Sequence, residues 1–162
     1  MNQQQLREFV VQPVLQKLDR VVPYSETAVE LLMMTQAHET QGGRYIKQVQ
    51  GPACGIYQIE PATHEDLWKN FLKCKGQRVM EWVQDWITAA GTEEQELCGN
   101  LLYQTAIARM IYYRDREPLP SENLKTEEGV LQLAQYAKRV WNTSAGKASV
   151  QDYKDAYIRH CI

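Results

Sequence analysis

The sequence has no long apolar segment: none of its apolar runs approaches the ~20 residues that a membrane span requires. Its start shows no charged region leading into an apolar core, so we expect no secretory signal. A formal net charge of -2 gives no basic field for a polynucleotide backbone. We therefore expect a soluble protein made in the cytosol, with neither stable membrane insertion nor a nucleic-acid partner.

Metal-binding spacings are also missing. The four cysteines, Cys54, Cys74, Cys98 and Cys161, form no CxxC pair, and the histidines show no HxxxH spacing. We expect no metal and no cofactor. Two disulfide bridges could form from four cysteines, but a chain of this length needs none for stability, so we expect reduced thiols.

Helical patterns fill most of the 162 residues, a length typical of one domain. Apolar residues recur at helical spacing in several segments, and Pro13 is expected to kink or divide the first helix. Thr63 can cap one helix, and Thr92 with Gln95 can cap a long one reaching about Tyr113. We predict a single, mainly α (α+β) domain over residues 1–162, with at most a small β element near residues 44–59.

Residues 25–63 are the most informative stretch. Ser25 is a good N-cap, and Ala28, Leu32, Thr35 and Glu39 follow on one face of a helix that two glycines end. Glu39 then lies in the last turn, on the inward face. Burial and the negative end of the helix dipole both favour a protonated carboxyl there, which is how a general acid is made at neutral pH. The alternative is an exposed glutamate that caps nothing.

The same stretch resembles the lytic transglycosylases of the goose-lysozyme-like group. Their pattern is a catalytic Glu, usually followed by Ser, then a loop to G-L-M-Q-x-x-P-x-T. Glu39-Thr40 is followed here by the matching residues Gly55, Gln58, Pro61 and Thr63, with Ile56 for Leu and Tyr57 for Met. A later family motif, A-Y-N-x-G, has a weaker counterpart in residues 140–146, where Trp141-Asn142 stands and the glycine is displaced by two positions.

The resemblance implies a lysozyme-like fold and cleavage of the β-1,4 bond between N-acetylmuramic acid and N-acetylglucosamine in peptidoglycan. Glu39 would be the catalytic acid and base, giving 1,6-anhydro products. Substrate binding would fall to Gln58, Tyr57, Trp141, Asn142 and Thr40. The partner would be the glycan strand. We expect a bacteriophage member of the family, either an endolysin or a virion component. It would be associated with other virion proteins or lie in the host cytoplasm, and it would act on the periplasmic wall.

Three alternatives stay open. A second acid, Glu60, Glu65 or Asp66, would make the enzyme a hydrolytic muramidase. A cysteine peptidase would use Cys54 as nucleophile with His38, His64 or His160 as base. A virion protein could also keep the shape as a glycan-binding module without turnover.

Overall fold

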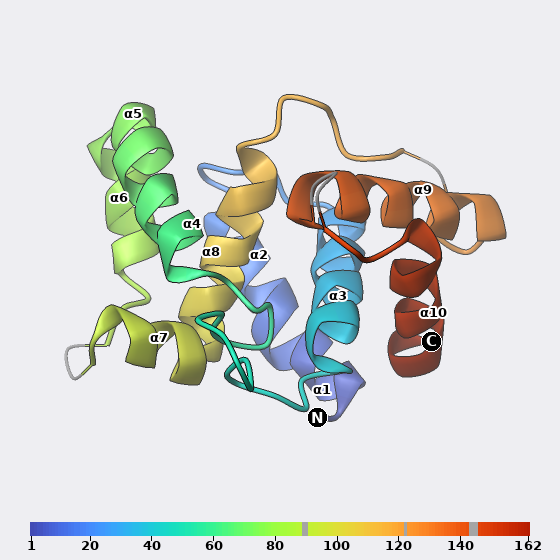
Figure 1. Cartoon of the computed structure of the whole chain (residues 1–162). Coiled ribbons are helices and arrows are strands. Elements are labelled where there is room, and N and C mark those ends of the chain that lie inside the picture. Colours follow the sequence, from blue (N-terminus) through green and yellow to red (C-terminus); the bar gives the residue numbers. More distant parts are fainter. Residues whose placement is uncertain (89–90, 122, 143–145) are drawn as a thin grey trace.

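The computed structural model describes residues 1–88, 91–121, 123–142 and 146–162, and these are mainly helical (Figure 1). In the described part, pairing of extended backbone is limited to two isolated antiparallel bridges, which join Cys54 to Lys47 and to Ile59. The prediction of a mainly α chain with at most a small β element near residues 44–59 is therefore confirmed.

The N-terminal part forms three helical segments and then the central helix. They are α1 (Gln3–Leu6), the π-helical turn η1 (Arg7–Val11), α2 (Gln12–Leu18) and α3 (Glu26–Thr40). Pro13 stands in the first turn of α2, and the backbone ahead of it is wound as a π-helix. The helix expected to kink or divide at Pro13 instead changes from π-helical to α-helical winding there. Proline causes this because it has no N–H to continue the α-helical hydrogen bonds.

The middle of the chain forms an arm of short helices, seen on one side of Figure 1. They are α4 (Pro61–Asp66), the π-helical turn η2 (Leu67–Leu72), α5 (Lys73–Lys75), α6 (Gln77–Gln84) and α7 (Glu93–Gly99). The expected cap at Thr63 is wrong: α4 begins at Pro61, after Glu60. Proline suits the first helical position because its φ is already helical and its missing N–H would have no partner there.

The long helix predicted to run from Thr92 to about Tyr113 is two helices in the structure. Thr92 and Gln95 form the expected capping box, but α7 ends at Gly99 and α8 (Leu101–Tyr113) begins after Asn100. Asn100 leaves the helical conformation (φ −97°, ψ 94°), and its side chain accepts the Tyr103 amide. Its amide also donates to the Trp86 carbonyl and to the Glu96 carboxylate (2.7 and 2.6 Å). Local periodicity could not reveal these tertiary partners.

The C-terminal part consists of α9 (Glu127–Ala137), the π-helical turn η3 (Lys138–Asn142) and α10 (Val150–Cys161). Thr126 caps α9, and Ser149 with Asp152 caps α10. The sequence of residues 142–146 predicts a break between these helices, and residues 143–145 of this segment lie outside the described residues.

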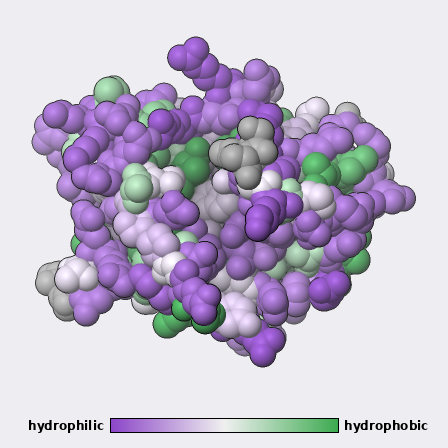
Figure 2. Space-filling view, viewed as in Figure 1, coloured by the Kyte–Doolittle hydropathy of each residue, from purple (hydrophilic) through white to green (hydrophobic). Residues whose placement is uncertain are grey.

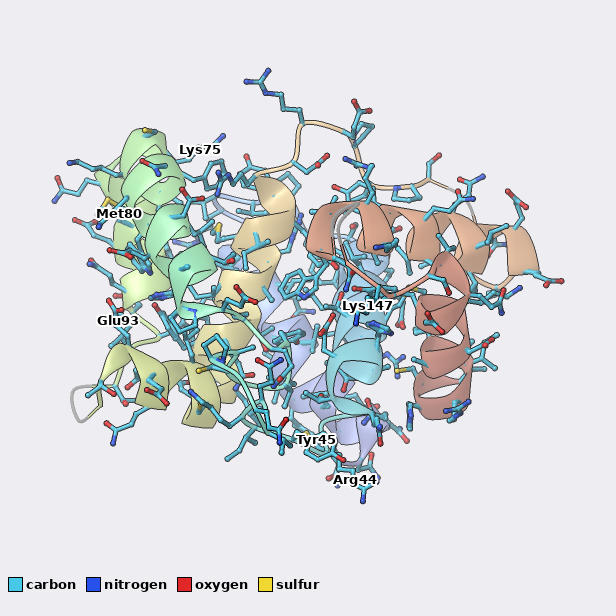
Figure 3. All side chains as sticks on the ribbon, viewed as in Figure 1. Arg44, Tyr45, Lys75, Met80, Glu93 and Lys147 are labelled. Atoms are coloured by element: carbon cyan, nitrogen blue, oxygen red, sulfur yellow. The ribbon has the colours of Figure 1, made fainter. Side chains whose placement is uncertain are left out.

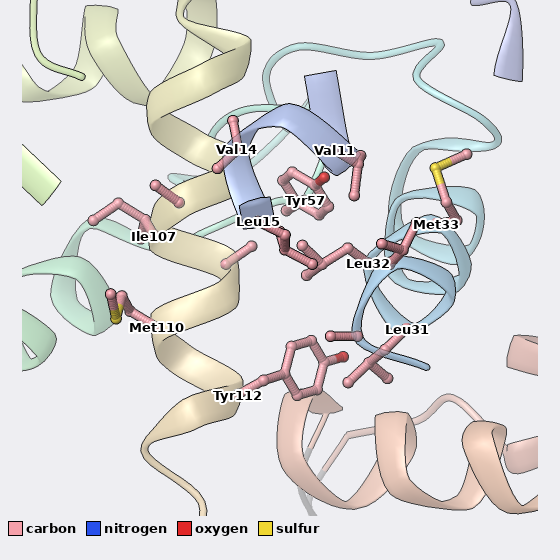
Figure 4. Close-up of a cluster of buried hydrophobic side chains, with 14 of the residues drawn as sticks. Val11, Val14, Leu15, Leu31, Leu32, Met33, Tyr57, Ile107, Met110 and Tyr112 are labelled. Carbon is pink, nitrogen blue, oxygen red and sulfur yellow. The ribbon is translucent and has the colours of Figure 1, made fainter. Parts of the chain in front are cut away.

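The core is built around α3, which packs against α2, α8, α9 and α10. Ala28, Leu32 and Thr35 face inward as predicted. The helix is buried on its other sides too, through Val29, Leu31, Met33 and Met34, so it is a central helix with little amphipathic character. Figure 4 shows Leu32 of α3 beside Leu15 of α2, and Leu31 of α3 beside Tyr112 of α8.

The surface seen in Figure 2 is largely hydrophilic, with hydrophobic side chains in small separate groups. Within the described ranges, none of the helices has both the length and the apolar character needed to cross a bilayer.

Candidate active site

Glu39 lies in the last turn of α3, where the core ends and a groove begins. Its side chain is half-buried, and its neighbour Thr40 is fully buried. The helix stops one residue later because Gln41 takes the left-handed conformation (φ 54°, ψ 48°). The sequence suggested glycine for this role, but the terminating residue is Gln41, and the two glycines continue the left-handed turn with φ of 77° and 79°.

Thr40 fastens the end of α3 to the segment that carries the second part of the motif. Its hydroxyl lies 3.0 Å from the Gln36 carbonyl and 2.9 Å from the Ile56 carbonyl, and it accepts the Gly43 amide at 3.1 Å. A buried hydroxyl with these three backbone partners holds the backbone in place. Thr40 is not among the described residues that line the groove, and its contacts give it a positioning role, while its expected part in substrate binding stays a prediction.

We call residues 41–60 the groove wall. Near its end Cys54 and Ile59 exchange both backbone hydrogen bonds (2.9 and 2.8 Å), and the chain turns between them. Gly55 is required in this turn: its φ is 75°, and a Cβ would lie 2.3 Å from the Leu97 carbonyl oxygen. The turn is also held by Gln104, whose Oε1 accepts the Ile56 amide at 2.6 Å.

Gln58 ends that turn in a strained conformation. Its φ is 50°, a value that glycine or asparagine adopts far more readily than glutamine. Its side-chain amide donates to the Gly55 carbonyl at 2.8 Å, which fixes its direction. Strain of this kind persists where the surroundings enforce it, and it is concentrated at functional sites.

Glu39 and Gln58 line the same groove, which has a volume of about 490 Å³. Its other described lining residues are Tyr45, Lys47, Gln48, Val49, Gln50, Ala53 and Glu60. Figure 3 labels Tyr45 on the groove wall, beside Arg44. We call this cavity the Glu39 groove. It combines one half-buried acid with several amide side chains and an aromatic ring, a composition suited to a carbohydrate.

The carboxyl of Glu39 is set up to hold a proton. Burial raises its pKa to about 7, and a hydrogen bond from the Tyr153 hydroxyl opposes that rise. Tyr153 donates to Glu39 Oε1 at 3.2 Å, and its ring stacks on His38 with centroids 3.9 Å apart. Burial lowers the pKa of His38, and the nearby charges of Asp152 and Lys138 shift it in opposite directions.

The second motif meets the first through Tyr153. Asn142 opposes the rise in pKa that burial causes at the Tyr153 hydroxyl, and Asn142 Oδ1 accepts from Lys138 at 2.9 Å. Gly146 lies against the same amide, since a Cβ on it would come within 1.7 Å of Asn142 Oδ1. The displaced glycine of the motif is therefore beside its asparagine. Residues 143–145 of this motif are outside the described part of the chain.

Two aromatic residues expected at the cleft are packing residues in this structure. Tyr57 is fully buried, with its hydroxyl 3.2 Å from Thr105 (Figure 4 shows it within the core). Trp141 is partly buried and stacks on Tyr112, with ring centroids 5.1 Å apart. Neither is among the described residues that line the Glu39 groove. Among the described residues, Tyr45 and not Tyr57 is the aromatic residue that lines the groove.

Sequence reasoning missed Tyr153 and, in the groove wall, the lining residues ahead of Gln58. Tyr153 lies 114 positions from Glu39, and its spacing with Tyr157 predicts only that both face inward from α10. The wall residues have no periodic pattern. Their only signal was their place between Glu39 and Gln58.

Comparisons with models of known protein families, with curated proteins and with solved structures find no match. The site must therefore be judged by its own chemistry. In the described ranges, no cluster of three or more His, Cys, Asp or Glu side chains is arranged to hold a metal ion.

The cysteine-peptidase alternative is not supported by the contacts of Cys54. This thiol is fully buried, and its partners are Lys47, the Pro52 carbonyl and Cys98. Burial is the main reason that its pKa is raised, which disfavours the thiolate that a nucleophile needs. Of the proposed bases, His38 stacks on Tyr153, and His64 bonds to the Tyr103 hydroxyl at 2.6 Å.

Proposed function

We propose that this protein is a peptidoglycan lytic transglycosylase with a lysozyme-like fold, and that Glu39 is its catalytic acid and base. The observation that carries the proposal is the state of Glu39. Its pKa is raised by burial to about 7, and its carboxyl opens onto a groove that Gln58 also lines. A carboxylic acid that is still protonated near neutral pH can donate to a glycosidic oxygen.

The reaction needs one carboxyl group. Glu39 would protonate the oxygen that leaves with N-acetylglucosamine, while the N-acetyl group of the muramoyl residue stabilises the positive charge at C1. The Glu39 carboxylate would then accept the proton of the muramoyl 6-hydroxyl, whose oxygen bonds to C1. The product is a 1,6-anhydromuramoyl end, and Glu39 regains its proton for the next cycle.

The groove supports binding of a polar, ring-shaped substrate. The amides of Gln48, Gln50 and Gln58 can exchange hydrogen bonds with hydroxyl and N-acetyl groups, and Tyr45 can lie against a sugar face. A volume of about 490 Å³ is within the usual ~300–1,000 Å³ of small-ligand pockets. The proposed partner is the glycan strand; encounters with other virion proteins, as a bacteriophage enzyme would have, are part of the same proposal.

Hydrolysis by a second acid is the other candidate, and Glu60 is the observation that favours it. Glu60 lines the Glu39 groove, while Glu65 pairs with Lys69 and Asp66 with Arg114 on the exposed side of α4. Glu60 could activate a water and so give a reducing end. Glu60 is exposed at the end of the groove wall, which makes it the less protected of the two acids.

Mass spectrometry of soluble products from purified sacculi tests these proposals. A transglycosylase releases muropeptides that weigh one water less than the products of a hydrolase. We expect the anhydro form, and its loss in the Glu39→Gln variant. Hydrated products would identify a muramidase, and release of nothing by folded protein would leave only a glycan-binding module.

A further inference from the structure

The strongest feature outside the proposed chemistry is a pair of cysteines at the back of the groove wall. Cys54 is paired through its backbone with both Lys47 and Ile59, so it stands in the middle of that wall. Gln58 lies one residue before Ile59, and Ala53 lies directly before Cys54; both line the Glu39 groove. A bond to the Cys54 side chain would therefore hold the groove from behind.

The groove wall rests on α7 at this point. Lys47 Nζ lies 3.4 Å from Cys54 Sγ and forms an ion pair with Glu94 of α7 at 2.6 Å. Gly55 lies against the Leu97 carbonyl, so closely that a Cβ would be 2.3 Å from its oxygen. Cys98 is next in sequence to Leu97.

Cys98 is also four residues after Glu94, and residues four apart share one face of a helix. Its side chain neighbours the Cys54 thiol and contributes to the raised pKa of that thiol. The two cysteines are 44 positions apart in sequence and meet only because the groove wall folds onto α7. Both are free thiols in this structure.

We propose that Cys54 and Cys98 form a disulfide when the protein meets an oxidising, disulfide-containing environment, and that this bond fastens the groove wall to α7. Such conditions hold outside the cytoplasm, where the glycan substrate lies. The link to that compartment rests on the proposed function; the formation of the bond does not.

The reaction is a pair of thiol–disulfide exchanges with a low-molecular-weight disulfide such as oxidised glutathione. Cys98, which is partly exposed, attacks first and releases one glutathione thiolate. The buried Cys54 then attacks the Cys98 sulfur and releases the second. The two protein thiols are oxidised, the glutathione disulfide is reduced to two thiols, and the two protons pass to the released thiolates. The raised pKa of the buried Cys54 thiol makes this second exchange the slower one, and the Lys47 ammonium beside it opposes that rise.

Peptide mapping of the full chain after equilibration in glutathione redox buffers tests the proposal. Free thiols are blocked with N-ethylmaleimide before digestion. We expect a Cys54–Cys98 cross-linked peptide as the main oxidised species, and a Tm higher by about 5–15 °C, as closing a loop of this length implies. Cys98→Ser should remove both effects, and Cys74→Ser, which alters an exposed cysteine of α5, should keep both.

The unaltered chain decides the question even if a variant folds poorly. Glutathionylation of Cys74 in the same digest proves that the oxidant reached the protein. If Cys74 is modified while Cys54 and Cys98 remain free, the proposal is wrong. Neither readout depends on cleavage of sacculi, so a cross-linked protein without activity would overturn the proposed function alone, and an active protein that never cross-links would overturn this proposal alone.

Discussion

Half-buried Glu39 and buried Glu96 have pKa values that are shifted in opposite directions. Burial raises the pKa of Glu39 to about 7, and the hydrogen bond from the Tyr153 hydroxyl opposes this rise. Glu96, on α7, is only 4% exposed. Burial alone would raise the pKa of Glu96 as well, but hydrogen bonds from the Thr88 side chain, the Asn100 amide and the Thr88 backbone outweigh it, and the pKa is lowered.

The difference shows that burial alone does not make a proton donor. Glu96 accepts the Thr88 amide at 3.1 Å and the Asn100 amide at 2.6 Å, and Thr88 Oγ1 bonds to it as well. A carboxylate with several donors stays charged and serves as a structural centre between α7 and the chain before it. A carboxyl deprived of donors beside a groove keeps its proton and can give it away.

The largest expected effect is on catalysis by Glu39. Glu39→Gln keeps the shape but removes the transferable proton, so release of muropeptides should fall at least ~100-fold. Glu96→Gln should leave the rate per folded molecule within about twofold, since Glu96 holds no proton for transfer at neutral pH. Turbidity loss of purified sacculi measures both. A Glu39→Gln variant retaining more than a few per cent of activity would contradict the assignment.

The next effect is on the pH dependence of stability. The pKa of Glu39 is raised on folding, so the folded chain binds more protons than the unfolded chain above the ordinary pKa of ~4.3. Its contribution is complete below that value and is lost as the pH rises through about 7, a change of about 4 kcal/mol in the free energy of unfolding. The slope for Glu96 has the opposite sign, since its pKa is lowered.

Urea unfolding at pH 5 and pH 8 measures this slope. Glu39→Gln should lose less stability than the unaltered chain between the two pH values, because it has no carboxyl to ionise there. The comparison with the unaltered chain removes the contributions that both proteins share. Equal slopes would show that Glu39 ionises as freely in the folded chain as in the unfolded one.

A third effect concerns the stability supplied by Glu96. Replacement by Gln turns one acceptor into a donor and leaves Thr88 or Asn100 unpaired, which should cost about 1–3 kcal/mol at neutral pH. Glu93→Gln is the matched control on the same helix, because the Glu93 side chain is 82% exposed. Urea midpoints compare the two. If both variants are equally stable, the hydrogen bonds to Glu96 carry no net stabilisation.

The smallest effect should come from Tyr153. Tyr153→Phe removes the hydrogen bond that favours the Glu39 carboxylate, so the alkaline limb of the pH–rate profile should move to higher pH. The rate near neutral pH should change less than about tenfold. Tyr157→Phe is the control one turn further along α10, since its hydroxyl donates to Glu30 of α3 at 2.7 Å. If the alkaline limb shifts in Tyr157→Phe, or shifts to lower pH in Tyr153→Phe, the limb does not report the ionisation of Glu39.

Much of the fold could be predicted, because its rules are local. The caps at Ser25 and Thr92 begin helices as expected, since a side-chain oxygen and the next amides are enough to form them. The missed boundary at Asn100 depends on Trp86 and Glu96, which local spacing cannot bring together. The location of Glu39 at the inner end of a helix was also a local result, and the structure gives it the half-buried position that was predicted.

The sequence by itself determined the helical character of the chain and the end of α3 after Glu39. Each of these depends on backbone preferences within a few residues. Only the tertiary structure decided which side chains face the groove, that Tyr57 packs inward while Tyr45 faces the cavity, and that Tyr153 reaches Glu39. The pKa of a carboxyl depends on its solvent and its hydrogen-bond donors, and the donors come from segments that the chain order keeps far apart.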